Sequence, residues 1–385
     1  MAGLDLSALA GHYELRPGQA HSVHGQRPVL GASVLGRVLR GQRGAQVGRT
    51  LSSVFTLCAH AHQRAASLAL GLATPGRVTL LLETARDHLR AMALDWPQRL
   101  SQPQSGTLDT DWWQDGPLSL VASTAYEDER AAAALTQLRE WLEQRILLEP
   151  VRDWLQRHGD PQALAQWCDA QAQCLPPARY LAAAYPVAQS LKPDTRLLQV
   201  LHDDSAQQTS QLQALARTIA QEPGFVQQPQ WQGACAENGP WARLRHRRGH
   251  GVKSHNAWTR LSARWMELME IAATSATPLT HSTHDEQPLL ASGTLRLSQD
   301  SALGWCEMAR GLLLHWVQHD ASGAVLDYRV LAPTEWNFHP QGALAQAVAA
   351  LAPNDAIAAQ TLAAAYDPCV VCSVHTTAKA EAHHA

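Results

Sequence analysis

The chain of 385 residues lacks any strong excess of one charge and any long apolar run. Its formal net charge is −3, so it has no overall positive field of the kind that binds nucleic acid, and we predict no nucleic-acid partner. No segment offers the roughly 18 uninterrupted apolar residues that a spanning helix needs, so we predict no membrane insertion. The start, MAGLDLSALAGHYELRPGQ, has no basic stretch followed by an apolar run, which predicts no secretory signal.

Cysteine is also scarce. The sequence contains seven cysteines, which is an odd number, and they are scattered along the chain. Together with the missing signal, this pattern argues against a disulfide framework and predicts reduced thiols in the cytoplasm. Two of the seven nevertheless stand three residues apart near the C-terminus, in YDPCVVCSVH. This pair needs a specific explanation.

Hydrophobic residues make up 45% of the chain, which is enough for a sizeable core. Apolar residues at helical spacing are frequent, and Gly71 is a plausible end for the first such run. The helices that this spacing predicts lie near 51–70, 128–147, 161–190, 206–221, 255–274, 341–351 and 354–365. The sequence therefore predicts a mostly helical fold.

Minor strands accompany these helices. Residues 1–50 predict strand and loop leading into a helix, and residues 77–96 predict a short strand or buried turn before another helix. Residues 311–332 alternate and turn at DASG, which predicts a hairpin. Residues 97–125 are rich in Pro, Gly and Ser and predict a surface loop. We find no internal repeat, so the prediction is a single α+β domain, mostly α, over residues 1–385.

The C-terminal motif has the chemistry of a metal site. Asp367 and Pro368 suit the N-cap and the first position of a helix, which predicts Cys369 and Cys372 on one helical face that His375 continues. Thiols in a first turn have a lowered pKa, and thiolates are soft ligands for zinc, iron or nickel. A solvent-facing pair without function is the simpler alternative. A redox-active Cys-x-x-Cys pair is possible, but no βαβ pattern precedes this one. Covalent haem attachment requires a histidine directly after the second cysteine, and a serine stands there instead.

A second group of possible ligands lies in LCAHAH. Cys58 and His62 are four residues apart on one face of the predicted helix. With the C-terminal cysteines they could complete a zinc-type site. A lone cysteine on an apolar helix is otherwise usually just buried.

These stretches resemble motifs of the nickel-iron hydrogenase large subunits. DPCVVCSVH is similar to the family's D-P-C-x-x-C-x-x-H, and VFTLCAHAHQRAA resembles a degenerate copy of its R-x-C-G-x-C-x-x-x-H. EMARGLLLHW resembles E-A-P-R-G-A-L-G-H-W, and LAPTEWN resembles V-P-S-T-W-N. The resemblance implies that Arg310, Pro333 and Thr334 surround the cyanide and carbon monoxide ligands of an iron atom. It also implies a helical domain like that of the large subunits, although residues 97–290 do not align.

The departures from the family concern nickel. In the large subunits, the second cysteine of each motif bridges nickel and iron, which corresponds to Cys58 and Cys372 here. Cys369 matches a ligand of nickel alone. Phe55 stands where the other such ligand should be, and its side chain cannot bind a metal. The resemblance therefore implies a complete iron half and no complete nickel site.

The sequence also lacks the residue that relays protons in the large subunits. The family carries a glutamate relay before the first motif, whereas no Asp or Glu occurs between Glu14 and Glu83 here. The early R-x-E-G-H is absent too, so the resemblance does not extend to the magnesium-type ion near His375. With these departures the chain resembles the hydrogenase expression/formation proteins of the HupK and HoxV type. These are maturation factors proposed to carry Fe(CN)2(CO) toward an apo large subunit.

The resemblance implies a non-enzymatic scaffold that binds iron transiently as Fe(CN)2(CO). The residues expected to support its cysteine ligands are His62, His375 and Asp367. Its partners would be maturation chaperones of the HypC and HypD type and an apo hydrogenase large subunit. Two alternatives stay open: a degenerate large subunit with catalytic activity, and a Cys/His interaction protein of the zinc type.

Two further stretches carry expectations. Residues 242–256, ARLRHRRGHGVKSHN, place five basic residues among three histidines, which fits either a solvated loop or a docking surface for an acidic partner. The tail over 375–385 is predicted to be flexible. We also expect it to stay attached, because the resemblance implies that such tails are removed only after nickel has been inserted.

Overall fold

The computed structural model describes residues 11–28, 32–74, 76–100, 112, 116–117, 128–247, 255–274 and 288–376. Most of the predicted loop over 97–125 lies outside the described residues. The same is true of residues 248–254 in the basic stretch and of tail residues 377–385.

Helices dominate the described chain, as predicted, so the fold is α+β and mostly α. The α-helices are α2 (Ala32–Leu39), α3 (Ala45–Val54), α4 (Ala59–Ala69), α5 (Arg77–Arg90), α6 (Trp96–Leu100), α8 (Asp128–Trp141), α9 (Val151–His158), α10 (Pro161–Gln171), α11 (Pro176–Ser190), α12 (Ser205–Gln221), α13 (Pro240–Arg247), α14 (Ala257–Thr274), α15 (Pro333–Asn337), α16 (Ala343–Ala349) and α17 (Ala356–Tyr366). Other helical segments are a 3-10 turn at Thr56–Cys58 and π-helical stretches at Ala91–Asp95 and Leu142–Leu147. The predicted helices from residue 128 onward are therefore confirmed.

Two predicted helical boundaries are wrong. The helix expected over 51–70 is broken at Phe55, which ends α3 and precedes the 3-10 turn. The strand or turn expected from residue 77 is the start of α5, whose buried Val78, Leu82, Ala85 and Leu89 repeat at helical spacing. The run of three leucines at its start obscured this period.

The larger sheet is antiparallel with the order β3-β4-β5-β6. Its strands are β3 (Ser292–Arg296), β4 (Ser301–Met308), β5 (Gly311–His319) and β6 (Val325–Leu331). The predicted hairpin is confirmed as β5–β6, and Asp320 closes its turn by accepting hydrogen bonds from the backbone N–H groups of Ser322 and Ala324. Gly323 supplies the positive φ of 77° that this turn needs.

A smaller sheet joins the two ends of the chain. β1 (His12–Leu15) pairs antiparallel with β2 (Val23–Gln26) and parallel with β7 (Val371–Val374), so that Tyr13 lies opposite Cys372. The helix predicted from Asp367 onward is therefore wrong. Asp367 instead caps the end of α17 with a left-handed φ of 47°, and the valine-rich segment that follows extends along the free edge of β1.

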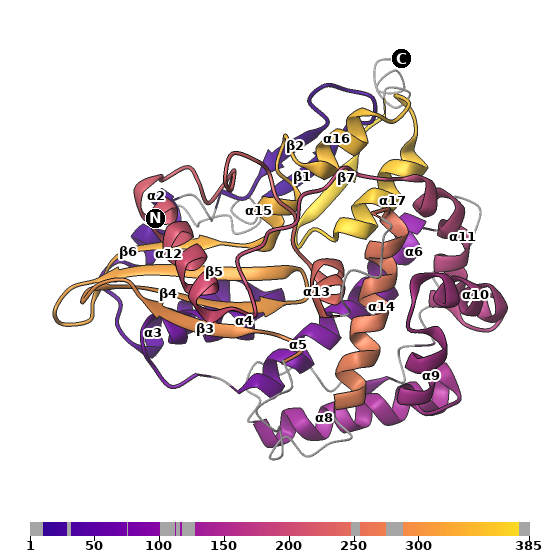
Figure 1. The fold of residues 1–385 in the computed structure, drawn as a ribbon, viewed down its shortest axis with the longest axis horizontal. Coiled ribbons are helices and arrows are strands. Elements are labelled where there is room, and N and C mark those ends of the chain that lie inside the picture. Colours follow the sequence, from indigo (N-terminus) through magenta and orange to yellow (C-terminus); the bar gives the residue numbers. More distant parts are fainter. Residues whose placement is uncertain are drawn as a thin grey trace, which may run out of the picture.

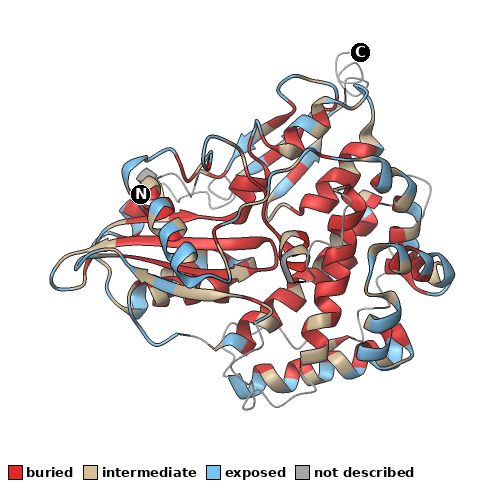
Figure 2. Cartoon of the chain, in the orientation of Figure 1, coloured by how far each residue is buried: buried red, intermediate tan, exposed pale blue. Residues whose placement is uncertain are grey.

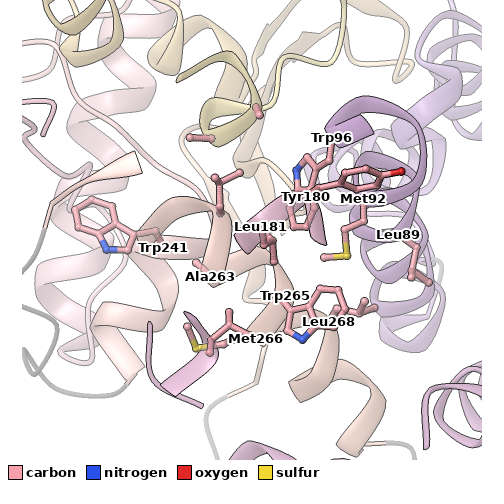
Figure 3. Packing of buried hydrophobic residues seen from close by; sticks show 14 of the residues in the cluster. Leu89, Met92, Trp96, Tyr180, Leu181, Trp241, Ala263, Trp265, Met266 and Leu268 are labelled. Atoms are coloured by element: carbon pink, nitrogen blue, oxygen red, sulfur yellow. The ribbon is translucent and has the colours of Figure 1, made fainter. Parts of the chain in front are cut away.

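The sheet and the helices form two halves of the molecule. The large sheet lies on the left of Figure 1, with α2, α3, α4 and α12 beside it. Most of the remaining helices lie on the right, around α14. Figure 2 shows α14 buried along most of its length. Figure 3 shows part of this helical core, where Met92, Trp96 and Tyr180 lie together. A second core forms where α4 packs on β4, and it contains Phe55 and Cys58.

Close contact between α4 and β4 depends on Gly304. A Cβ atom at this position would lie 2.2 Å from the carbonyl oxygen of Ala65 and 2.4 Å from the nitrogen of Ala69. Both are backbone atoms of α4, so the helix itself would have to move. We therefore expect Gly304→Ala to lower the free energy of unfolding by about 1–3 kcal/mol. Urea denaturation followed by tryptophan fluorescence measures this change.

Gly224→Ala is the matched control. A Cβ atom at Gly224 meets nothing within 4 Å, so its stability should stay close to that of the wild type. Equal stability of the two alanine variants would contradict this account of how α4 is positioned.

Candidate functional site

Four of the residues singled out by the motifs lie near one another: Cys58 at the N-terminus of α4, Arg310 in the turn between β4 and β5, Thr334 at the start of α15, and Cys369 after the end of α17. Arg310 occupies the turn and is 2% exposed. Its Nη1 donates to Asp87 Oδ2 at 3.0 Å, and its Nε lies 3.1 Å from Asp367 Oδ2. Burial lowers the pKa of Arg310, but the carboxylates of Asp367 and Asp87 raise it more. Arg310 is therefore a fixed cation.

Asp367 is held by a second arginine. Arg264 on α14 places its Nη1 2.8 Å from Asp367 Oδ2. Burial raises the pKa of Asp367, but Arg264 and Arg310 outweigh it and keep the pKa below its ordinary value. Asp367 thus fixes the end of α17, and with it the segment that leads into Cys369. The role expected of Asp367, to support the cysteine ligands, stays a prediction.

Cys58 and Cys369 come from distant parts of the chain and lie near each other. Cys58 is the N-cap of α4 and is buried. Burial raises the pKa of Cys58 well above the ordinary value, and the nearby Cys369 adds to this effect. Thr334 Oγ1 is 3.2 Å from Cys369 Sγ, and Pro333 begins the short helix that positions this hydroxyl. The site thus combines two thiols with a hydroxyl.

Cys372 is placed differently. It lies on β7, and its thiol is packed into the helical core rather than into the core around Cys58. Burial raises the pKa of Cys372 to about 11. Among the described residues, no three His, Cys, Asp or Glu side chains converge closely enough to hold a metal ion. The expectation that Cys58, Cys369 and Cys372 form one cluster is therefore not met: Cys372 lies on β7, which pairs with β1, whereas Cys369 precedes that strand and lies beside Thr334.

The two histidines of the motifs also differ from expectation. His375 is exposed at the end of β7, where it helps Arg16 to lower the pKa of Glu14. His62 is buried, and its Nδ1 lies 3.0 Å from Nε2 of His315 rather than bonding to a thiol. Its ring stacks on that of Phe55, with the centroids 3.8 Å apart. His62 therefore supports Phe55, and His375 lies away from the thiol pair.

Sequence reasoning missed the part played by α5 in holding Cys58. Glu83 accepts hydrogen bonds from the backbone N–H groups of His60 and Ala61, at 2.8 and 3.0 Å. Arg86 donates to the carbonyl oxygen of Leu57 at 2.6 Å. Burial, with a contribution from the nearby Asp87, raises the pKa of Glu83 to about 8. A carboxylic acid thus lies beside Cys58 even though the sequence around Cys58 contains none.

The sequence does contain a pattern that could have indicated these buried acids: two carboxylates stand four residues apart within an apolar segment. Glu83 and Asp87 share one face of α5 within LLLETARDHL. Such buried acids need partners, and their partners are the backbone of α4 and Arg310. The strand assignment for this segment hid the pattern.

Arg27 and Glu335 were also missed. Arg27 follows β2 and is buried, and its Nη1 lies 3.4 Å from Glu335 Oε1. Its guanidinium carbon lies 5.8 Å from the centroid of the Phe55 ring. Burial raises the pKa of Glu335 to about 7. Nothing in the local sequence of either residue predicts this pairing, because it joins segments that are 308 residues apart.

The docking interpretation of the basic stretch fails for Arg243. This residue on α13 is buried and forms a double contact with Glu267, Nε to Oε1 at 2.9 Å and Nη2 to Oε2 at 2.7 Å. It therefore contributes to the core and not to a surface.

In the part of the chain that the structure describes, no helix has the length and apolar character needed to cross a membrane.

The arrangement suits a metal unit whose own ligands accept hydrogen bonds. Two thiols can bind the metal, and Thr334 lies beside one of them. Arg310 Nη2 and Arg27 Nε are buried donors that have no hydrogen-bond partner within the described structure. Buried donors without acceptors are costly, so acceptor atoms on a bound unit would satisfy them. These residues therefore fit such a unit.

Comparisons with known proteins show which families this chain is similar to. A profile of nickel-dependent hydrogenases matches residues 256–375. The hydrogenase expression/formation protein HoxV of Cupriavidus necator is 36% identical, covering 94% of this chain and 94% of that protein. HupK of Rhizobium leguminosarum bv. viciae is 26% identical, covering 90% and 91%. Among solved structures, a NAD+-reducing NiFe-hydrogenase in the H2-reduced state covers 91% of this chain and 93% of its own, with 15% identity and a TM-score of 0.43.

The relation to HoxV extends over nearly the whole of both chains, and its identity is high enough to show common descent. The profile match includes Arg310, Thr334, Asp367, Cys369 and Cys372. The chain therefore belongs to the family of hydrogenase expression/formation proteins that includes HoxV and HupK.

Proposed function

We propose that this protein is a non-catalytic scaffold for hydrogenase maturation that carries iron as Fe(CN)2(CO). The observation that carries the proposal is the buried Nη2 of Arg310, which has no hydrogen-bond partner among the described residues, on an arginine whose charge interacts with Cys369 and Cys58. Cyanide ligands bear negative charge on nitrogen and are strong acceptors for a guanidinium group. The relatives named as expression/formation proteins support a maturation role.

A catalytic role receives less support from the site. Phe55 is buried and stacked on His62 at the position that would need a further nickel thiolate. We propose that cargo is delivered by maturation chaperones of the HypC and HypD type and passed to an apo large subunit of a NiFe hydrogenase. All seven cysteines are free, which fits action in a reducing cytoplasm.

Metal analysis combined with infrared spectroscopy tests this proposal. Protein purified without oxygen from a host that contains hydrogenase maturation factors should hold iron without nickel and show CO and CN stretching bands. Iron with nickel and hydrogen turnover would support the catalytic alternative instead. Zinc without diatomic ligands would support the interaction protein of the zinc type.

Arg310→Lys tests the role of the guanidinium group. Lysine keeps the positive charge but cannot direct a planar Nη2 donor at a bound ligand while also contacting Asp87 and Asp367. We expect the iron content to fall roughly tenfold or more, and the CN bands of any remaining iron to shift. Arg196→Lys, at an exposed arginine bonded to Gln232, is the matched control and should leave both unchanged. Unshifted CN bands at full iron content in Arg310→Lys would count against the proposal.

A further inference from the structure

Asn238 lies beside the turn that carries Arg310. It is 8% exposed, and its Oδ1 accepts a hydrogen bond from the backbone N–H of Leu312 at 2.9 Å. Gly311, between Arg310 and Leu312, has a φ of 136°, and a Cβ atom there would lie only 1.6 Å from Asn238 Oδ1. Glycine at this position therefore lets the asparagine approach the turn closely enough to hold it.

The same asparagine is paired with the end of α15. Its backbone N–H donates to Asn337 Oδ1 at 3.1 Å, and Asn337 Nδ2 donates to the carbonyl oxygen of Asn238 at 2.9 Å. Asn337 is 6% exposed and ends the short helix that presents Thr334. Because water does not replace hydrogen bonds in a buried place, both bonds are costly to break. Asn238 thus links the turn that carries Arg310 to the helix that carries Thr334.

Glu237 connects the same segment to the end of α17. Its two carboxylate oxygens accept hydrogen bonds from Nε and Nη2 of Arg260 on α14, both at 2.7 Å. The hydroxyl of Tyr366 donates to Glu237 Oε2 at 3.1 Å, and Tyr366 directly precedes Asp367. Glu237 and Asn238 therefore contact all three segments that bring Arg310, Thr334 and Asp367 together, and they do so through side chains that local sequence patterns did not single out.

We propose that Asn238 is a positioning residue of the candidate site. It acts through Arg310, by holding the turn at a fixed place relative to Thr334, so that the guanidinium group keeps one orientation toward a bound metal unit. A guanidinium group donates in fixed directions, so its value to a ligand depends on such positioning. The inference deepens the proposed carrier function and rests on it for the identity of the bound unit. The linkage of Asn238 to the turn and to Asn337 is a property of the apo protein and does not rest on it.

Amide hydrogen exchange of the apo protein tests this linkage. Asn337→Ala removes both bonds to the backbone of Asn238 but leaves the acceptor of the Leu312 amide in the chain. We expect the Leu312 amide to exchange at least about tenfold faster than in wild type, because its acceptor is no longer held in place. Asn337→Asp keeps the oxygen that accepts from Asn238 N–H, folds more readily, and should show a smaller increase. Unchanged protection of Leu312 in both variants would overturn the inference.

Infrared spectra of iron-loaded protein test the action through Arg310. Asn238→Ala removes the acceptor of the Leu312 amide, so the guanidinium group should no longer keep one orientation. We expect the CN bands to shift and broaden, with a smaller loss of iron than the roughly tenfold loss expected for Arg310→Lys. In the Arg310→Lys background, Asn238→Ala should change the CN bands no further, because the group through which it acts is gone. Unchanged CN bands in Asn238→Ala, or an equal further shift in the double variant, would overturn the positioning role.

Asn256→Ala is the matched control for the loss of a buried asparagine. Asn256 is 4% exposed, accepts a hydrogen bond from Thr259 N–H at 2.9 Å and donates to the carbonyl oxygen of Gln189 at 3.3 Å. This variant should be less stable but keep the CN bands and the Leu312 exchange rate of wild type. Changes equal to those of the Asn238 and Asn337 variants would show general loosening and overturn the inference. Absence of CO and CN bands from wild-type protein isolated from its host would instead remove the carrier function, and the exchange result would still decide whether Asn238 holds the turn.

Discussion

Replacing Cys58 with alanine is expected to remove bound iron together with its CO and CN infrared bands. Cys58 lies at the N-terminus of α4, where Glu83 and Arg86 fix the surrounding backbone, and it is the one thiol of the first motif. Loss of one ligand from a small ligand set removes most of the affinity for a soft metal. Iron determination and infrared spectroscopy on the anaerobically purified variant measure the loss.

The two C-terminal cysteines should differ in this experiment. Family resemblance alone predicts that Cys372→Ala is as severe as Cys58→Ala and that Cys369→Ala is milder. The structure predicts the reverse order, because Cys369 lies beside Cys58 and Thr334 whereas the thiol of Cys372 is packed into the helical core. We therefore expect Cys369→Ala to lose more iron than Cys372→Ala.

Cys174→Ala is the control, since this cysteine is exposed on another part of the surface and should be replaceable without loss of cargo. Full iron content in a Cys58→Ala, Cys369→Ala double variant would refute the proposed thiol pair. Greater loss in Cys372→Ala would show that β7 rearranges when cargo binds.

Glu267→Gln is expected to destabilise the protein by roughly 3–5 kcal/mol, because it removes the nearest counter-charge of the buried Arg243 and leaves Glu307, at 4.0 Å, as the next carboxylate. Glu267 is fully buried in α14, accepts two hydrogen bonds from Arg243, and lies 2.8 Å from His88 Nε2. It thereby joins α14, α13 and α5. Glu140→Gln, at an exposed site on α8, is the control and should change stability little. Urea denaturation at neutral pH measures both.

The effect of Glu267→Gln should depend on pH with a definite sign. Burial raises the pKa of Glu267, but Arg243 and His88 outweigh burial and hold the pKa far below its ordinary value. A depressed folded pKa contributes stability above the unfolded pKa of about 4.3, and this contribution is lost as the pH falls below it. The difference between wild type and variant should therefore shrink in acid. A difference that stays constant from pH 7 to pH 3 would contradict this explanation.

The sequence by itself determined much of the architecture. Apolar spacing determined α8, α10, α11, α12, α14, α16 and α17, since a helical face that packs against a core must repeat at about 3.6 residues, whereas it did not predict α9, α13 or α15. The DASG segment determined the turn between β5 and β6, because Asp320 and Gly323 satisfy its hydrogen bonds and backbone angles locally. The motifs also identified Cys58, Arg310, Thr334 and Cys369, which do lie near one another.

Only the tertiary structure decided which groups face the site. The segment after Asp367 has a local preference for a helix start, yet Val371–Val374 pairs with the edge of β1. Cys372 on this strand packs into the helical core, while Cys369, which precedes the strand, lies beside Thr334. Arg27, Glu83 and Glu335 reach the thiol pair from segments far apart in the chain. Local sequence cannot specify such pairings, because they depend on long-range packing and on the strong preference of buried charges for a partner.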